Sequence, residues 1–339
     1  FGYPIGTNVE RQMVAAIRRL GVDEVYNMDM TADLTIMEEA NELVERIQGG
    51  KTLPMFTSCC PAWVKFLEHY YPEMIPHLST CKSPQAMFGA VLKSYYAQKH
   101  GLNPDDIFVI SCIPCTAKKF EVTRPQLRAE GEDFDDTDVA LTSRELAAMI
   151  RESALDFQKL PEEQFDDPFE IGSGAGTIFG ATGGVMEAAL RTAAVTLDGK
   201  CENLEFTEVR GTKGIKEATY TLGGMDLNIV VVSGLANARK VLDEIKAGTR
   251  TVHMLEVMSC PGGCINGGGQ IIPCDNDINS VDIKTLRAKA LYDADAANEL
   301  RMSHENPVCI KLYDEFFEKP GSKVAHRYLH TSYVPRERV

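Results

Sequence analysis

Six of the ten cysteines fall into three short groups in which thiolates could hold a metal ion or an iron–sulfur cluster. Clustered thiols at this modest density indicate metal or redox chemistry rather than a disulfide framework. The Pro-Gly-Gly sequence inside the last group leaves the backbone free to wrap around a ligand. The three groups are Cys59-Cys60, Cys112-x-x-Cys115 and Cys260-x-x-x-Cys264.

The spacing of these groups leaves two kinds of site open. Cys60 and Cys115 are too far apart in the sequence for a local metal knuckle, so the fold must bring three loops together. Four thiolates would then suit a [4Fe–4S] cubane or a tetrahedral zinc ion. On spacing alone, it is about equally plausible that each cysteine pair only packs in the core or forms a small structural zinc site. The solitary cysteines are expected to be small buried hydrophobic residues: Cys81, Cys201, Cys274 and Cys309.

The elements that must position these loops follow a recurring order of strand, loop and helix. The apolar run 107–110 predicts a buried strand that leads into Cys112, and the run 254–257 predicts a strand that leads into Cys260. This order favours an α/β architecture in which strand ends meet at the site. Further predictions are strands over 22–28 and within 205–232, a short apolar run over 53–56, helices over 8–20, 34–47, 63–70, 85–100, 186–190 and 236–245, and a solvated loop over 130–138.

The composition argues against a nucleic-acid surface and against a membrane span. Of the 339 residues, 44% are hydrophobic and 25% are charged, and the net charge is −14. A nucleic-acid surface would need clustered Lys and Arg. No apolar stretch approaches the roughly 20 residues that cross a bilayer, and no signal-peptide pattern is found. We therefore expect a cytoplasmic protein.

The letters of the three loops resemble those of a known family. TSCCPAW, PCTAKK and EVMSCPGGCINGGGQ, in this order, are similar to the signature loops of the [FeFe]-hydrogenase catalytic domain. The resemblance extends to TADLTIMEEANELVERI, SGAGTIFGATGGVMEAALR and LYDEFFEKPGS, and covers nearly the whole chain. It implies an α/β fold of two lobes of mixed sheets flanked by helices, with the metal site in the cleft between them. It also implies one catalytic domain over residues 1–339 that starts inside the family's domain and lacks accessory iron–sulfur domains.

This resemblance implies a specific cofactor, the H-cluster. In the family, four cysteines hold a [4Fe–4S] cubane, and one of them bridges to a di-iron subcluster with carbon monoxide, cyanide and azadithiolate ligands. Soft thiolates suit this chemistry. By motif position the ligands would be Cys60, Cys115, Cys260 and Cys264, with Cys264 as the bridge.

The resemblance also implies a route for protons. Cys59 would remain free and relay protons to the cofactor, and Glu39, Glu42 and Ser79 would continue the relay, with Arg46 at its outer end. Glu39 and Glu42 are at helical i and i+3 positions, and Arg46 follows Glu42 by four, so all three share one helix face. Without the resemblance, a solvated face with an ordinary ion pair would be the better interpretation.

A further group of residues would surround the di-iron subcluster. Lys118 would donate a hydrogen bond to a cyanide ligand, since its ammonium has three donors. Pro84, Gln85, Phe179 and Met258 would line a largely apolar pocket that controls solvent access. Taken singly, each of these four could equally be an ordinary packing residue.

The sequence departs from the family pattern in three places. Ile113 stands where the family commonly has methionine, which we expect to tune the pocket. Cys112 is also unusual there and could add redox sensitivity. The family usually has a valine–alanine–proline segment just upstream of the position of Phe1, and this segment is not in the sequence.

The function implied is the reversible reduction of protons to dihydrogen. Electrons would come from a ferredoxin-like donor or a partner subunit, and dedicated maturation proteins would install the cofactor. Two alternatives remain open. One is a hydrogen sensor with slow turnover, and the other is a non-enzymatic relative that serves iron–sulfur protein assembly.

Overall fold

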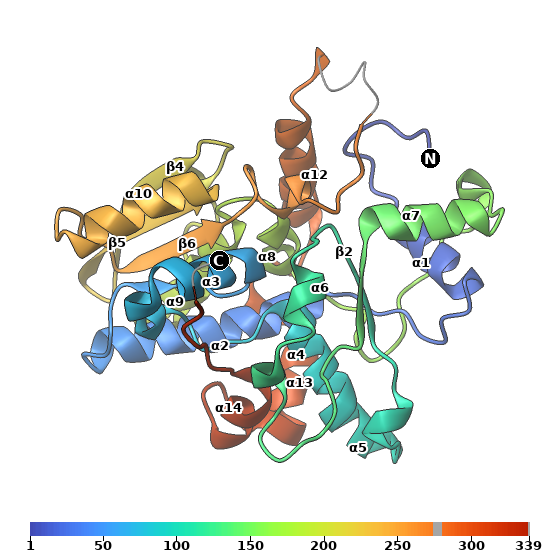
Figure 1. Cartoon of the computed structure of the whole chain (residues 1–339), viewed down its shortest axis with the longest axis horizontal. Coiled ribbons are helices and arrows are strands. Elements are labelled where there is room, and N and C mark those ends of the chain that lie inside the picture. Colours follow the sequence, from blue (N-terminus) through green and yellow to red (C-terminus); the bar gives the residue numbers. More distant parts are fainter. Residues whose placement is uncertain (274–279, 338–339) are drawn as a thin grey trace.

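The chain forms an α/β structure with two separate sheets, and its computed structural model describes residues 1–273 and 280–337. In Figure 1 the four-stranded sheet lies at the left, and strand β2 of the second sheet lies to the right of the centre. The long helix α2 (Asp29–Gln48) runs beneath the larger sheet toward the centre. This arrangement confirms the α/β fold with helix-flanked sheets.

The larger sheet is mixed. β1 (Met55–Phe56), β6 (Met254–Met258) and β5 (Met225–Ser233) are neighbours that run parallel to one another. β4 (Ile215–Leu222) pairs antiparallel with β5 at the outer edge. The sheet confirms the strands that the alternating and apolar runs of the second half of the chain predicted.

Helices cover both faces of this sheet. Odd-numbered residues of β5 pack with α2 and α9 (Gly184–Asp198) on one face. Even-numbered residues pack with α3 (Pro61–Tyr70) and α10 (Leu235–Lys246) on the other face. A strand that is buried on both faces needs a nearly continuous apolar sequence, which β5 and β6 have.

The second sheet is a parallel pair, β2 (Ile110–Ile113) and β3 (Val139–Thr142). The strand predicted over 107–110 therefore lies three residues further along the chain. It is also not buried on both faces, because the side chain of Phe108 is 68% exposed and that of Ile110 is 40% exposed. In the described part of the chain, β2 has a strand neighbour on one side only, so its other edge is unpaired in the sheet.

The strand predicted over 22–28 was wrong. The backbone N–H of Val25 donates to the carboxylate of Asp166 (2.7 Å), and the N–H of Asp166 donates to the carbonyl of Val25 (2.9 Å). The N–H of Asn27 donates to the carbonyl of Phe169 (3.2 Å). The backbone hydrogen bonds of this extended segment are thus made with a loop, residues 166–169. Among the described residues the segment pairs with no strand.

The solvated loop predicted over 130–138 is partly buried. Asp136 is 3% exposed and accepts a hydrogen bond from Lys82 Nζ (2.7 Å), which is itself buried. Lys93 Nζ lies 2.8 Å from the carboxylate of Asp138. Burial raises the pKa of Asp136 to about 6, although Lys82 opposes the shift. Lys82, which lies just before the helical run that starts at residue 84, and Lys93 within that run therefore hold the acidic loop against the core. An acidic composition alone did not reveal this.

The predicted helices are present with small shifts at their ends. The first begins at Glu10, because the side chain of Asn8 accepts a hydrogen bond from the backbone N–H of Glu10 (2.9 Å). The run predicted over 85–100 is helical throughout but contains a π-helical turn. The helices not yet given bounds are α1 (Glu10–Arg19), α4 (Pro84–Val91), the π turn (Leu92–Tyr96), α5 (Ala97–His100), α6 (Lys118–Glu121), α7 (Ser143–Glu152), α8 (Gly174–Thr177), α12 (Ile283–Ala297), α13 (Pro307–Leu312) and α14 (Lys323–Leu329).

The solitary cysteines divide into buried and partly exposed ones. Cys81 and Cys309 are fully buried, as expected. Cys201 is partly exposed, and its thiol lies 3.2 Å from the carbonyl of Asn203. The expectation for Cys274 lies outside the described residues.

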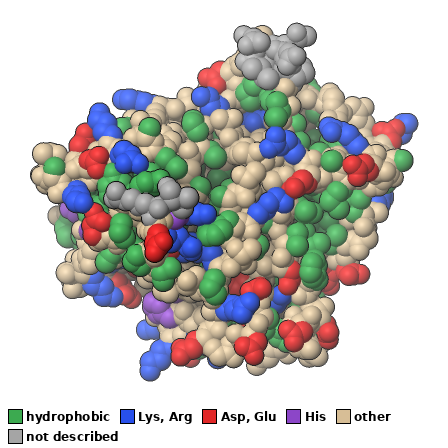
Figure 2. All heavy atoms as spheres, in the orientation of Figure 1, with side chains coloured by type: hydrophobic (Ala, Val, Ile, Leu, Met, Phe, Trp, Pro, Cys, Tyr) green, Lys and Arg blue, Asp and Glu red, His purple; other side chains and the backbone are tan. Residues whose placement is uncertain are grey.

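Charged side chains of both signs are interspersed over the face seen in Figure 2. Within residues 1–273 and 280–337, no helix combines the length and the apolar character that crossing a membrane requires.

A buried ion cluster attaches α12 to the core. Arg191 of α9 donates two hydrogen bonds to the carboxylate of Asp295 (2.9 and 2.8 Å), and both side chains are buried. The same guanidinium donates to Glu187 (2.8 Å). Arg301 also contacts Asp295 (2.5 Å). Charges buried in this way are tolerated only while each has its partners.

We expect Asp295→Asn to lower the free energy of unfolding by about 3–5 kcal/mol, because it leaves the buried Arg191 without its main counter-charge. The measurement is chemical denaturation followed by circular dichroism. The control is Asp293→Asn on the same helix, whose carboxylate pairs with the exposed Lys289. Its expected effect is within about 0.5 kcal/mol. Equal effects of the two substitutions would contradict the role of the buried cluster.

Candidate functional site

The cysteine loops converge because two of them leave neighbouring parallel strands. Cys60 follows β1 and Cys260 follows β6. The carboxyl ends of parallel strands lie at the same edge of a sheet, so both loops begin side by side. The hydroxyl of Ser259 lies 3.3 Å from Cys60 Sγ and joins the two loops directly.

Cys115 and Cys264 complete a group of four thiols. Burial raises the pKa of Cys264, and the thiols of Cys60, Cys115 and Cys260 raise it further. Burial likewise raises the pKa values of Cys115 and Cys260, and the nearby Cys60 thiol raises both of them further. All four are partly buried and none is in a disulfide. The fold therefore brings together the four cysteines that the motifs singled out.

Backbone N–H groups support two of these thiols. The N–H groups of Lys118 and Ala117 face Cys115 Sγ and lower its pKa, against the larger effect of burial. The N–H of Gly268 acts in the same way on Cys260. Hydrogen bonds of this kind favour the thiolate form, which is the form that binds metals.

The donor set fits a group that the chain itself does not supply. Four soft thiolates in one place suit an iron–sulfur cubane or zinc. Their mutual repulsion would be relieved by metal cations. Two buried polar atoms near these loops, Glu39 Oε2 and Thr182 Oγ1, have no hydrogen-bond partner among the described residues. The Thr182 backbone contacts the cysteine loop itself, since its N–H donates to the carbonyl of Gly262 (3.1 Å).

Polar side chains of α2 lead from the surface toward the thiols. Glu42 Oε1 accepts a hydrogen bond from Arg46 (2.6 Å), one helical turn further along. Glu42 Oε2 accepts from the hydroxyl of Ser79 (2.8 Å). The Glu42 side chain is 14% exposed and that of Arg46 is 7% exposed, so Glu42 is the more accessible of the two to solvent.

Glu39 occupies the inner end of this line. Its carboxyl group is buried and faces the hydroxyl of Ser79. Burial raises the pKa of Glu39 to about 8, and the nearby charge of Glu42 adds to the shift. Burial also raises the pKa of Cys59, and among the neighbouring charged groups Glu39 adds most to this shift. The predicted relay residues therefore lie in one sequence from Glu42 to Cys59.

Arg46 differs from the other members because its guanidinium is fully engaged. An arginine does not release its proton near neutral pH, so it cannot pass protons itself. It holds Glu42 in place and ties the end of α2 to neighbouring loops. Besides Glu42, its acceptors are the carbonyl groups of Thr52, Pro76, His77 and Leu78.

Lys118 is held by a carboxylate that the sequence analysis missed. Its Nζ donates to Glu121 (2.7 Å) and to the carbonyl of Cys59 (3.2 Å). Burial lowers the pKa of Lys118, but the Glu121 carboxylate outweighs burial and the net shift is upward, so the ammonium stays charged. Glu121 also accepts from Ser83 (2.9 Å) and Gln85 (3.1 Å). The i, i+3 spacing of Lys118 and Glu121 was the available signal.

The predicted pocket residues lie around the same place. Met258 ends β6 and packs in one apolar group with Phe179 and Cys59. Pro84 starts α4 and is partly buried. Gln85 is buried, and both ends of its amide are engaged, one by Glu121 and the other by the hydroxyl of Ser111.

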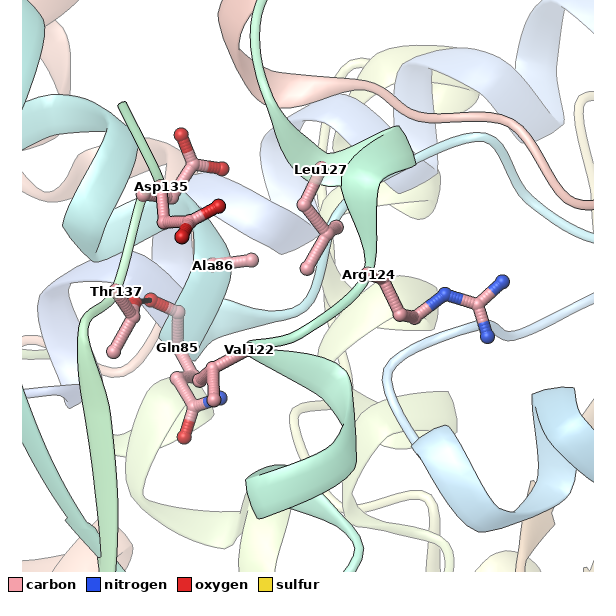
Figure 3. A pocket seen from close by; sticks show the side chains of 8 residues that line it. Gln85, Ala86, Val122, Arg124, Leu127, Asp135 and Thr137 are labelled. Atoms are coloured by element: carbon pink, nitrogen blue, oxygen red, sulfur yellow. Dashed lines mark hydrogen bonds between the residues drawn. The ribbon is translucent and has the colours of Figure 1, made fainter. Parts of the chain in front are cut away.

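A small cavity lies behind Gln85. It has a volume of about 10 Å³, which is room for about one water molecule. Figure 3 shows Gln85, Ala86 and Thr137 at its wall, while the guanidinium of Arg124 points away from it. Asp136 Oδ1 is buried at this wall without a partner among the described residues. The cavity has room for one buried water, which could bond to Asp136 Oδ1.

Two family models match the chain. The model described as the iron-only hydrogenase large subunit, C-terminal domain, matches residues 1–268. The model described as the iron hydrogenase small subunit matches residues 281–336.

Similar proteins include curated hydrogenases and a solved structure. Iron hydrogenase 1 of Clostridium pasteurianum is 44% identical over 98% of this chain, and the NADP-reducing hydrogenase subunit HndD of Solidesulfovibrio fructosivorans is 47% identical over 100% of it. The match spans 58% of the length of each of these relatives. A structure of the [FeFe]-hydrogenase HydA1 of Chlamydomonas reinhardtii matches with a TM-score of 0.86 and 38% identity, covering 98% of this chain and 90% of that one.

More distant relatives carry a different name. The cytosolic Fe-S cluster assembly factor narfl of Danio rerio is 28% identical over 98% of this chain and 82% of its own length. The chain is therefore similar both to hydrogenases and to Fe-S cluster assembly factors, and the residues of the site must distinguish the two.

The buried Glu39 predicts a pH-dependent stability. Its pKa of about 8 lies above the ordinary value of 4.5, so the folded chain binds this proton more tightly than the unfolded chain. That contribution to stability is complete below pH 4.5 and is lost as the pH rises through 8. Glu39→Gln should therefore raise the Tm by a few degrees above pH 8 and leave it unchanged near pH 4.5.

Thermal unfolding of wild type and variant across this pH range is the measurement. Glu45→Gln on the same helix is the control, because Lys51 lowers the pKa of Glu45 and the sign of its linkage is opposite. A Tm difference between Glu39→Gln and wild type that does not change with pH would contradict the raised pKa of Glu39.

Proposed function

Because the chain belongs to the iron-only hydrogenase family, we propose that it catalyses the reversible conversion of two protons and two electrons into dihydrogen. The observation that carries this proposal is the line of proton-carrying side chains from Glu42 to Cys59, which ends one residue before the thiol of Cys60. A structural metal site would not need a buried route for protons.

The proposed cofactor is the H-cluster. Cys60, Cys115, Cys260 and Cys264 would hold its [4Fe–4S] cubane, and Cys264 would bridge to the di-iron subcluster with its carbon monoxide, cyanide and azadithiolate ligands. When bound, this group supplies the electrons and the iron at which hydrogen is handled. The crowding of four unpaired thiols supports this assignment.

The chain's own residues would move protons and exclude water. A proton that reaches Glu42 Oε2 passes over the hydroxyl of Ser79 to Glu39, whose raised pKa lets it hold a proton at neutral pH. Glu39 Oε2 has no other partner in the described chain and is free to exchange the proton with Cys59 Sγ. Groups whose pKa lies near the operating pH transfer protons most readily.

Other residues would hold the di-iron subcluster in a dry pocket. Lys118 is charged, and Glu121 and the Cys59 carbonyl occupy two of its three donors, which leaves one for a cyanide ligand. Pro84, Gln85, Phe179 and Met258 would form the wall. Because Glu121 and Ser111 engage the Gln85 amide, we propose that Gln85 lines this pocket in a fixed orientation.

The partners and the location follow from the same proposal. Electrons would enter from a ferredoxin-like protein or a partner subunit, and maturation proteins would install the di-iron part. One relative is named as a subunit of an NADP-reducing hydrogenase, which supports the second source. We propose that the regions matched by the two family models form one catalytic domain, because buried ion pairs join them. A cytoplasmic location stays a prediction.

The alternative function is iron–sulfur protein assembly without a di-iron group. Its support is the likeness to assembly factors at 28% identity. The intact line from Glu42 to Cys59 favours the hydrogenase, and it also favours a catalyst over a slow sensor, which has less need of rapid proton delivery.

An infrared spectrum of anaerobically matured protein tests the proposal. We expect sharp bands from metal-bound carbon monoxide and cyanide, and we expect these bands to shift under dihydrogen. Cys264→Ala should lose the bands, whereas Cys201→Ser should keep them, because the Cys201 thiol contacts the carbonyl of Asn203 and is not a proposed ligand. A protein that binds a cubane after maturation but shows no such bands would support the assembly function instead.

Replacing the thiol at the inner end of the relay tests the proton route. Cys59→Ala should lower hydrogen evolution by about 100-fold or more, because a positioned proton donor contributes this much. Its infrared bands should remain, since Cys59 is not a proposed ligand. Hydrogen evolution at the wild-type rate in this variant would exclude Cys59 from the relay.

A further inference from the structure

Two buried charged side chains hold one peptide bond next to the cysteine loop. Lys216 Nζ donates to the carbonyl of Thr182 (2.7 Å), and Glu256 Oε1 accepts from the N–H of Gly183 (2.6 Å). These are the two polar groups of the same peptide unit. Lys216 is 5% exposed and Glu256 is not exposed at all.

The sheet places Lys216 and Glu256 on either side of the turn at the start of α9. Lys216 of β4 is paired with Val231 of β5, and Val231 is paired with Glu256 of β6. Residues in one row across a sheet point to the same face, so Lys216 and Glu256 face α9 together. Two strand spacings separate them, or about 10 Å between their Cα atoms. The turn at the start of α9 lies between them.

The two opposite charges do not form an ion pair with each other in the described structure. Lys216 instead makes a second hydrogen bond to the carbonyl of Gly211 (2.9 Å), and Glu256 accepts a second one from the N–H of Met186 (2.8 Å). Burial lowers the pKa of Lys216 to about 8, although Glu256 opposes the shift. Burying two charges is costly, so their retention indicates that the turn must be held firmly.

The turn that they hold is in contact with the loop between Cys260 and Cys264. The N–H of Thr182 donates to the carbonyl of Gly262 (3.1 Å). A Cβ atom on Gly263 would lie 2.6 Å from the Thr182 nitrogen, so the two backbones touch. Gly263 has a φ of +100° and forms no regular strand or helix that would fix it.

We propose that Lys216 and Glu256 are positioning residues for the metal site, which fix the Thr182–Gly183 peptide and through it the loop that carries Cys260 and Cys264. The proposal rests on the iron–sulfur function proposed above. Hydrogen bonds from the turn keep the two thiols of this loop in place before the cluster binds, against the repulsion between neighbouring thiolates. Loss of either charge loosens the loop and with it two of the four ligands.

The test uses the full chain loaded with a [4Fe–4S] cluster from ferrous iron and sulfide under anaerobic conditions. The variants are Lys216→Met, Lys216→Arg and Glu256→Gln. The matched control is Glu217→Gln, the next residue on β4, whose carboxylate is 56% exposed and pairs with Arg250. Iron release to a chelator and the electron paramagnetic resonance spectrum of the reduced cluster are the two readouts.

We expect Lys216→Met to release iron about 10-fold faster than wild type and to broaden the resonance spectrum, because a loose loop gives several ligand geometries. Lys216→Arg should restore most of the retention, since a guanidinium can donate to the same carbonyl groups. Glu256→Gln should fall between, because one amide oxygen replaces two carboxylate oxygens. Glu217→Gln should match wild type.

Wild-type iron release and an unchanged spectrum in both Lys216→Met and Glu256→Gln would overturn the inference. If Lys216→Met does not fold, Glu256→Gln decides the question with the same readouts: faster iron release than wild type supports the inference, and wild-type release and spectrum overturn it. A wild-type chain that takes up no cubane would instead contradict the proposed function, which makes the two failures distinguishable.

Discussion

Strands β1 and β6 lie side by side and run parallel, so the two chain segments that leave them start from one edge of the sheet. Cys60 and Cys260 sit on these segments and become neighbours for this reason alone. Burial fixes the register of the pairing, since a slip of one residue would move every side chain of a strand to the opposite face of the sheet. The other two thiols are then brought in by β2 and by the turn after Cys260. Every further property of the site depends on this alignment.

Burial around the thiols sets the chemistry of the neighbouring polar groups. A buried carboxylate needs hydrogen-bond donors or a proton. Glu42 and Glu121 obtain donors from Arg46 and Lys118, respectively. Among the described residues, Glu39 has no cation in contact, and burial raises its pKa to about 8. The fold thus gives carboxylates of one residue type different partners: Glu121 anchors a cation, Glu42 accepts from both Arg46 and Ser79, and Glu39 is left to hold a proton.

The sequence predicted the features that depend on local hydrophobic patterns and on the motifs of the cysteine loops. The apolar runs and glycine boundaries placed most helices and the strands of the larger sheet. The failures concern long-range partners. Val25 is bound by a distant loop rather than by a strand, and Asp136 is buried because Lys82 lies opposite it. Lys216 was missed for the same reason, because nothing near it in the sequence shows what it contacts. Glu121 is different, because its i, i+3 spacing to Lys118 was visible in the sequence.

The adjacency of Cys59 and Cys60 explains how one short loop can serve two purposes. The backbone at Cys60 is extended, with φ −94° and ψ 103°, before α3 begins. Successive side chains on an extended backbone point to opposite sides. One thiol can therefore join the group of four while the other faces Glu39, whose charge acts on it. Proline at the first position of α3 ends the extended stretch directly after Cys60. Cys59 and Cys60 are therefore the last two residues whose side chains alternate in direction before the helix begins. The proposed cluster ligand and the proposed proton carrier would thereby be held one residue apart on a segment that follows strand β1 of the sheet.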